Sequence, residues 1–414
     1  MRDFEHCINV LLKVTQEGIP FSLAINSSLK NDKKISDHSL RGIISSSCGG
    51  LLRHYYSLMK NVENAYEGLD EKNKLIIALC LSNKLFSKLI DEEKLLAYAK
   101  KETSINDISK FLEKYNSPAD LIPEEVVADS DEYFHLKCNL PLWLVKMWKK
   151  NLGDTLSTKL FKTLTYKGYQ TLRVDINKIT RDAFLEKYPE YAALETDGLV
   201  SMKGKNVEPL REGDALNMYA GYTYMLRSLD IDIFRGAAVY SGSSNNILDE
   251  LYAKLGTSLK LDYLCGNQSQ YLDAKKKAQK YGITDLSVYE CGYSAIRTCI
   301  SKPVHTFIVC PVNTALQRMR EESDYFLRVN QDDLDTLIVN QRTALENAAE
   351  LVEEGGYLVY AIPTLCRNET YSLVRKFISE HSNFTLEKET QLFPFDKFNS
   401  MLYFAVMKKE IKND

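Results

Sequence analysis

Residues 340–370 read NQRTALENAAELVEEGGYLVYAIPTLCRNET, and this stretch decides the fold. Its first half continues a helical apolar pattern that predicts a helix over residues 332–354, closed by Gly355 and Gly356. The following YLVYAIP is a continuous apolar run of strand length, and a second helical pattern, ETYSLVRKFISEHS, comes after it. A helix, a buried strand and another helix in this order are typical of a parallel sheet covered by helices.

The same alternation extends in both directions, from residue 209 to the end of the chain. It predicts strands in DIFRGAAVYSG, LKLDYLCG, LSVYECG, HTFIVCPV, YLVYAIP, FTLEKET and MLYFAVMKK, with helices such as SSNNILDELYAKLG and NQSQYLDAKKKAQKYG between them. Alternating units of this kind predict a doubly wound sheet with helices on both faces. Ligands of such sheets bind beyond the carboxyl ends of the strands, so the informative loops follow Tyr240, Cys265, Cys291, Val312 and Pro363.

The first 130 or so residues show only helical periodicity, which predicts a helical bundle followed by a polar linker over residues 117–131. A short aromatic helix is expected over residues 140–148, with its two tryptophans in a core. A strand in YQTLRVDINK, a helix capped by Thr180 and a strand in GLVSMKG follow it. We therefore expect three domains, with boundaries at 1–135, 136–208 and 209–414.

Composition excludes several classes of protein. Of the 414 residues 44% are apolar and the formal net charge is −3, which favours filled cores and counts mildly against a dedicated nucleic-acid binder. The nine cysteines contain no CxxC and no zinc spacing, so we expect no metal site and reduced, mostly buried thiols. No apolar run approaches 18 residues and no leader stands at Met1, so the expectation is a cytoplasmic protein without a membrane contact.

Several motifs, taken in chain order, resemble one family. GGLLRHYYSL is similar to a segment of NusB-like domains, and LPLWLVKMWKKNLG, TLRVDINK, PLREGDALNM, residues 340–370 and MLYFAVMKK resemble the RsmB/Sun-type (NusB-fused) RNA cytosine-5 methyltransferases. The resemblance covers nearly the whole chain. It implies a Rossmann-like class I methyltransferase domain with an antiparallel last strand, preceded by an all-α NusB-like bundle and a small α+β RNA-binding subdomain.

The resemblance also shows where this chain departs from the family. In the family, one cysteine thiolate adds to carbon six of cytosine and a second cysteine helps to release the adduct. Both residues are cysteines because the chemistry needs a good nucleophile that is also a good leaving group. The two cysteine positions hold Pro363 and Val312 here, so no catalytic residue is assigned. The nearest thiols are Cys310 and Cys366, which are displaced from those positions along the chain and are expected to be core or loop residues.

The cofactor motifs are altered as well. The family's glycine-rich loop corresponds to a stretch that includes Tyr240, Ser241, Gly242 and Ser243, in which the bulky Tyr240 replaces proline and is expected to fill the pocket. The acid that would hold the ribose hydroxyls falls at Gly266 or Asn267, and the acid of the next loop falls at Gly292. Pro311 completes the degenerate pocket. S-adenosylmethionine is therefore implied by resemblance and disfavoured by the residues.

Three hypotheses for the function remain open. The first is an RNA-binding pseudo-methyltransferase for ribosomal RNA, with Arg53, Arg173 and Arg320 as RNA contacts; Arg173 stands in the motif-like TLRVDINK and its guanidinium can grip a phosphate with two hydrogen bonds. The second is an active RNA methyltransferase with a rearranged site that uses Cys310 or Cys366. The third is a protein-interaction module that acts through the helical N-terminal domain.

Overall fold

The structure is a computed structural model. It describes residues 2–29, 38–164, 169–194, 198–203, 206–217, 219–229, 236–242, 246–316, 322–396 and 400–411. The chain divides into two compact units, one formed by residues 1–166 with 318–331 and the other by residues 167–317 with 332–414. The three-domain division at 135/136 and 208/209 stays a prediction.

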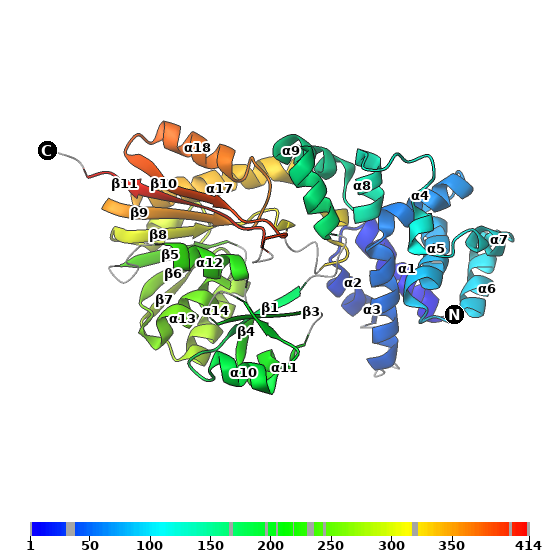
Figure 1. Ribbon diagram of the computed structural model, residues 1–414, viewed down its shortest axis with the longest axis horizontal. Coiled ribbons are helices and arrows are strands. Elements are labelled where there is room, and N and C mark those ends of the chain that lie inside the picture. Colours follow the sequence, from blue (N-terminus) through cyan, green and yellow to red (C-terminus); the bar gives the residue numbers. More distant parts are fainter. Residues whose placement is uncertain are drawn as a thin grey trace. The chain divides into compact units, whose positions relative to one another are not determined.

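The first unit is helical throughout the part that the structure describes, as predicted from the periodicity (Figure 1). Side chains that cap helices set several of its boundaries; Asp70, for example, accepts a hydrogen bond from the backbone of Asn73. Its elements are α1 (Arg2–Thr15), α2 (Phe21–Leu29), α3 (His38–Leu52), α4 (Tyr55–Ala65), α5 (Glu71–Ser82), the π-helical turn η1 (Asn83–Ser87), α6 (Glu92–Thr103), α7 (Ile108–Glu113), the 3-10 turn η2 (Pro118–Leu121), α8 (Asp131–Cys138), α9 (Leu142–Leu164) and α16 (Tyr325–Arg328).

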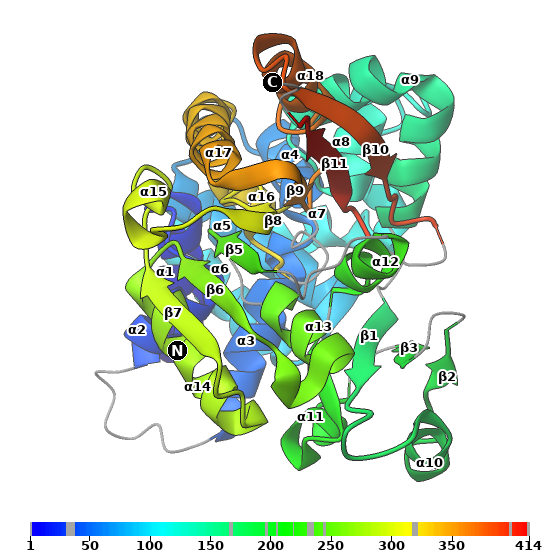
Figure 2. The same cartoon turned by 90° about the vertical axis from the view of Figure 1, so that its left-hand side faces the viewer.

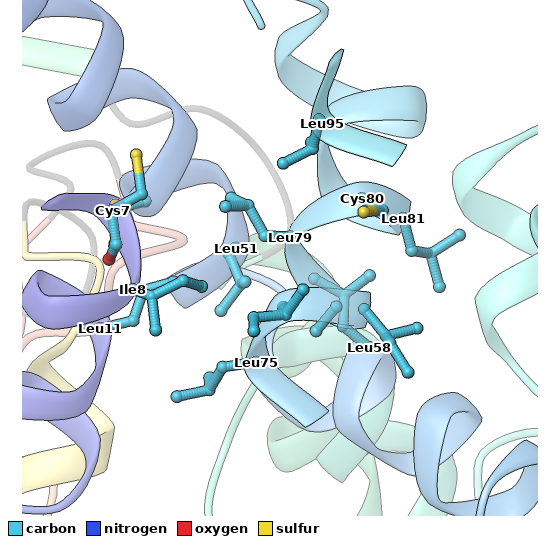
Figure 3. Close-up of a cluster of buried hydrophobic side chains, with 14 of the residues drawn as sticks. Cys7, Ile8, Leu11, Leu51, Leu58, Leu75, Leu79, Cys80, Leu81 and Leu95 are labelled. Atoms are coloured by element: carbon cyan, nitrogen blue, oxygen red, sulfur yellow. Dashed lines mark hydrogen bonds between the residues drawn. The ribbon is translucent and has the colours of Figure 1, made fainter. Parts of the chain in front are cut away.

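Figure 3 shows the core of this unit, where leucines of α3, α4 and α5 meet Cys7, Ile8 and Leu11 of α1. Trp148 lies in the interior of α9 and is fully buried, as expected of a core residue. The predicted helix over residues 140–148 is too short. It continues to Gly153, whose positive φ of 74° breaks the helical geometry, and a second helical stretch follows as far as Leu164.

The second unit contains a small antiparallel sheet with strand order β2-β3-β1-β4. Its elements are β1 (Tyr169–Val174), α10 (Arg181–Lys187), β2 (Ala192–Ala193), β3 (Leu199–Lys203), α11 (Glu208–Glu212) and β4 (Ala215–Asn217). Thr180 caps α10 by accepting a hydrogen bond from the backbone of Ala183, as predicted. Leu172, Val174, Phe184 and Val200 fill the core between this sheet and α10.

The larger sheet of the second unit has seven strands in the order β10-β11-β9-β8-β5-β6-β7. The strands from β9 to β7 in this order are parallel, and β11 lies antiparallel between β9 and β10, which confirms the predicted antiparallel last strand. The elements are α12 (Ala220–Ser228), β5 (Ala237–Ser241), α13 (Asn246–Leu255), η4 (Gly256–Ser258), β6 (Leu261–Cys265), α14 (Gln268–Tyr281), β7 (Leu286–Glu290), α15 (Ile296–Cys299), β8 (Val304–Cys310), α17 (Asp332–Glu350), β9 (Val352–Ile362), α18 (Tyr371–Glu380), β10 (Phe384–Gln391) and β11 (Tyr403–Lys409).

Helices cover both faces of this sheet, so that it forms the middle of three layers (Figure 2). One face packs against α12, α13 and α14, and the other packs against α15, α17 and α18. Successive residues of β5 alternate between the two cores, with Val239 on the first face and Ala238 and Tyr240 on the second. Every residue of β5 and β8 is buried, as expected of parallel strands covered on both faces, and most of these residues are apolar.

The predicted end of the long helix at residue 354 is wrong. α17 ends at Glu350, and β9 already begins at Val352. Gly355 and Gly356 form a bulge within β9, where its register with β8 shifts between Val304 and Thr306. A Cβ atom on Gly356 would lie 2.6 Å from the carbonyl oxygen of His305, so this glycine lets two strands approach and is not a helix cap.

The described residues were searched for a membrane-spanning helix and for a metal-binding group. No helix among them is long and apolar enough to cross a membrane. The described part of the chain also contains no group of three or more histidine, cysteine, aspartate or glutamate side chains placed to hold a metal ion. All nine cysteines are free thiols, and seven of them are buried.

Candidate functional site

The predicted site lies at the carboxyl ends of the parallel strands. β5, β6, β7, β8 and β9 end at Ser241, Cys265, Glu290, Cys310 and Ile362, within two residues of the predicted ends. Sheet-like backbone hydrogen bonds continue beyond these ends. Gly242 N donates to Cys310 O (2.8 Å), Gly266 N to Ser241 O (2.9 Å) and Cys291 N to Cys265 O (2.8 Å). The first residues of the loops therefore stay paired with their neighbours.

Gly242 and Gly266 bring three of these loops into direct contact. A Cβ atom on Gly242 would lie 2.4 Å from the backbone nitrogen of Val312 and 2.9 Å from the carbonyl carbon of Pro311. A Cβ atom on Gly266 would lie 2.9 Å from the carbonyl oxygen of Gly242. Both glycines are thus required because backbone packs against backbone at these two positions.

Tyr240 belongs to β5 and not to the loop. Its side chain is 1% exposed and packs in the core on the face of α15 and α17, together with Leu264, Ile296 and Tyr360. Burial raises the pKa of the Tyr240 phenol far above its usual range. Ser241, which follows it, is fully buried on the other face of the sheet. The tyrosine therefore occupies core volume beneath the loops; its predicted role in filling the cofactor pocket stays a prediction.

The two positions that hold catalytic cysteines in the family lie here at the starts of the loops after β8 and β9. Neither residue at these positions carries a nucleophile. Val312 follows β8 with 39% of its surface exposed, and Pro363 directly follows β9 and is buried. Cys310 is the last residue of β8 and is 4% exposed; burial raises the pKa of its thiol to about 12. Cys366 is 1% exposed, and burial, together with the charge of Glu369, raises its thiol pKa to about 12. At pH 7 such thiols are roughly one part in 10⁵ thiolate.

Glu369 is a site residue that the sequence reasoning missed. It occupies the acidic position of the family motif matched in residues 340–370, and that match was the available signal. The side chain is completely buried and accepts hydrogen bonds from Thr314 N (2.9 Å), Thr314 Oγ1 (2.6 Å), Thr364 Oγ1 (2.9 Å) and Gln341 Nε2 (2.8 Å). It thereby ties the loop after β8 to the loop after β9. Burial raises the pKa of the Glu369 carboxyl.

The residues at the ends of β6 and β7 do not fit S-adenosylmethionine in the manner of the family. Gly266 has no side chain, and the Asn267 Oδ1 atom accepts from Gln270 N (3.1 Å) as the cap of α14. Gly292 offers no acid either, although a Cβ atom there would meet open space. Glu290 is exposed at the end of β7. No carboxylate thus stands at the end of β6 to accept the two ribose hydroxyls.

Of the predicted RNA contacts, Arg53 belongs to the first compact unit and Arg173 to the second. Arg173 is 7% exposed, and its Nε atom lies 3.8 Å from Glu250 Oε2, a carboxylate that is 1% exposed. This placement differs from that expected of a phosphate-binding arginine, because the guanidinium is itself buried and lies beside a buried acid. Arg53 directly follows α3 and is exposed. Ser243 and Arg320 lie outside the described residues.

The strand order, the antiparallel β11 and the loops at the carboxyl edge define the class: a Rossmann-like class I methyltransferase fold with a helical N-terminal unit. Solved structures support this fold. The crystal structure of PH0851 has a TM-score of 0.73 at 16% identity, over 99% of this chain and 98% of that one. NSun6 from Pyrococcus horikoshii, solved with SFG, has a TM-score of 0.55 at 12% identity, over 66% of this chain and 99% of that one.

Similar sequences identify the family that the chain resembles. The probable ribosomal RNA small subunit methyltransferase B of Bacillus subtilis (strain 168) is 24% identical over 301 residues, which are 68% of this chain and 64% of that protein. The ribosomal RNA small subunit methyltransferase B of Thermus thermophilus is 33% identical over 81 residues, 20% of each chain. This chain thus spans less than two thirds of either relative, and no family model matches it. The resemblance to the RsmB/Sun-type methyltransferases is confirmed.

Proposed function

We propose that this chain binds ribosomal RNA through a methyltransferase fold that transfers no methyl group. The RNA part of the proposal is supported by the two relatives, both of which are named as ribosomal RNA small subunit methyltransferases. The proposed absence of methyl transfer is supported by the residues at the carboxyl edge of the sheet.

One observation carries the proposal. Both positions that need a thiol hold residues without one, Val312 and Pro363. The nearest thiols cannot take over, because Cys310 and Cys366 are buried and the pKa of each is raised to about 12. Addition to a pyrimidine requires an accessible thiolate, and reactive cysteines have lowered pKa values and partial exposure. Cys310 and Cys366 differ from reactive cysteines in both respects, since they are buried and their thiol pKa values are raised.

The close packing of the loops supports the same conclusion. Since the backbones of Gly242, Gly266 and Val312 are in contact, Gly242, the residue that follows β5, is braced by its neighbours. The end of β6 lacks an acid, so the methyl donor would lose its usual hydrogen-bond acceptors. We therefore propose that the retained fold serves binding, and that no step of this protein's action uses S-adenosylmethionine.

The test combines RNA binding with methyl transfer. Purified full-length chain is incubated with small-subunit ribosomal RNA and radiolabelled S-adenosylmethionine, with the Bacillus subtilis relative as the positive control. We expect filter-retained RNA and no incorporated label. Label that disappears in Cys310→Ser or Cys366→Ser would overturn the proposal and establish a rearranged active site. Absence of RNA binding would instead favour a protein-interaction module.

A further inference from the structure

The helical unit contains a cavity of about 620 Å³ that the methyltransferase fold does not explain. Its walls come from the start of α2, from one face of α3 and from residues 322–328, which belong to the same compact unit. A volume of this size is ordinary for a small-molecule site. The lining includes Phe21, Ser45, Ser46, Gly49, Arg53 and Glu322.

Arg53 is the cation available to a ligand in this cavity. It makes no ion pair and no side-chain hydrogen bond with the described part of the chain, and its side chain is exposed. Arg328, the other lining arginine, is held by Glu322 Oε2 at 2.7 Å and by Asp324 Oδ2 at 2.6 Å. One arginine is therefore neutralised by the protein, whereas Arg53 is not.

Serine hydroxyl groups line the same cavity as this arginine. Ser45, Ser46 and Gly49 lie on one face of α3, and Arg53, which follows α3, continues the helical spacing through its backbone hydrogen bond to Gly49 O of 3.2 Å. Ser45 and Ser46, like Ser22 and Ser323 elsewhere in the wall, form no side-chain hydrogen bond within the described residues. The lining of the cavity thus contains several unused donors and an unused guanidinium.

Phe21 supplies an aromatic surface next to these polar groups. Its ring lies over α3, so that a Cβ atom on Gly49 would sit 3.5 Å from Cε1 of the ring. The backbone nitrogen of Phe21 donates to Asp324 Oδ2 at 2.9 Å, which fixes the start of α2 against the opposite wall. An aromatic ring, a guanidinium and hydroxyl groups are the groups with which proteins hold an unpaired nucleotide.

We propose that this cavity binds one nucleotide of a single-stranded RNA, with its phosphodiester on Arg53 and its base on Phe21. The charges favour an internal nucleotide over a free one. The formal charges of the four ionisable lining residues sum to zero although Arg53 itself is unpaired, and a wall without net charge tolerates a singly charged phosphodiester better than a doubly charged phosphate monoester. The inference rests on the proposed RNA binding and assigns it a location.

The experiment measures binding of a fluorescent single-stranded RNA pentamer to the full chain by anisotropy at fixed salt. We expect Arg53→Ala and Phe21→Leu each to weaken binding about 10-fold, and Arg53→Lys to weaken it less, since a point charge keeps the attraction without the paired hydrogen bonds. Gly49→Leu should block the cavity without changing its charge. Gly49→Ala, whose added methyl group makes only ordinary contacts, is the matched control for folding.

Lys101→Ala is the charge control, because it removes an exposed cation from α6, outside the cavity lining. Pentamer binding that is unchanged in Arg53→Ala, Phe21→Leu and Gly49→Leu would overturn the location but leave the proposed RNA binding intact. No pentamer or ribosomal RNA binding by the wild type would overturn both. Adenosine monophosphate that competes more strongly than the pentamer would replace the RNA with a free nucleotide and so contradict the proposal.

Discussion

The carboxyl edge of the seven-stranded sheet and the cavity of the helical unit differ in how their polar groups are used. At the sheet edge, backbone packs on backbone at Gly242, Glu369 accepts four hydrogen bonds, and the neighbouring thiols are buried. In the cavity, Arg53 and several serine hydroxyls have no partner within the described chain. Polar groups that the protein has left unpaired remain available for hydrogen bonds to a ligand.

Two arginines show the same contrast. The sequence predicts the same role, contact with RNA phosphate, for Arg173 and Arg53. Arg173 is buried beside the carboxylate of Glu250, whereas Arg53 is exposed and unpaired within the described residues. Sequence similarity to a motif therefore does not separate an arginine that holds the protein together from one that can hold a ligand. The burial of the side chain and its pairing with an acid distinguish the two kinds of arginine.

The largest expected effect is that of Arg173→Ala on stability. The substitution removes the cation that lies 3.8 Å from the buried carboxylate of Glu250, which should lower the free energy of unfolding by about 3 kcal/mol. Urea denaturation measures this change. Arg53→Ala is the paired comparison and should change stability by less than about 0.5 kcal/mol, because an exposed, unpaired cation contributes little. Equal stability of the two variants would remove the contrast between the arginines.

Glu369→Ala should destabilise the protein by nearly as much. It removes the acceptor of four hydrogen bonds and leaves the backbone nitrogen of Thr314 and the amide of Gln341 buried without it, a loss of about 3 kcal/mol. The same urea denaturation is the measurement. If Glu369→Ala unfolds at the wild-type urea concentration, Glu369 does not hold the two loops together.

The pH dependence of stability tests the environment of Glu369 separately. Because burial raises the pKa of this carboxyl, the folded protein binds its proton more readily than the unfolded chain does. The stability of the wild type relative to Glu369→Gln should therefore decrease as pH rises above the ordinary glutamate value of 4.5, since the buried charge then forms. Unfolding free energies of both proteins between pH 4 and 8 give this difference. A difference that grows with pH would show that the hydrogen bonds outweigh the burial.

A smaller effect is expected of Gly242→Ala. Its Cβ atom would lie 2.4 Å from the backbone nitrogen of Val312, so the loops must move apart, at about 2 kcal/mol of stability. Gly292→Ala is the matched control, because its Cβ atom would meet nothing within 4 Å, and its stability should stay within about 0.5 kcal/mol of the wild type. Differential scanning calorimetry of both variants makes the comparison. Similar melting temperatures would mean that the edge is not closely packed at Gly242.

The smallest effect concerns the rate of thiol modification. Cys310 and Cys366 are buried with raised pKa values, whereas Cys299 is partly exposed. Iodoacetamide at pH 8, followed by peptide mass spectrometry of the native protein, should therefore label Cys299 before the other two. Early labelling of Cys310 or Cys366 would reveal an accessible thiol at the sheet edge and would strengthen the rearranged-site hypothesis.

The sequence predicted the sheet well and the site only in part. Continuous apolar runs such as YLVYAIP identified the strands, because residues buried on both faces leave a clear pattern. The end of α17 was misplaced, since Gly355 and Gly356 read as a helix cap but form a bulge in β9. Glu369 and the cavity beside Arg53 depend on contacts between distant segments, which periodicity does not encode.

The most direct test of the central claim, that this fold no longer handles a methyl donor, is a calorimetric titration of the full chain with S-adenosylmethionine and then with S-adenosylhomocysteine. The Bacillus subtilis relative serves as the positive control. The account predicts no detectable heat and no competition at millimolar ligand. Binding at micromolar concentration, about −8 kcal/mol, would contradict it, because the pocket would then have survived with altered residues.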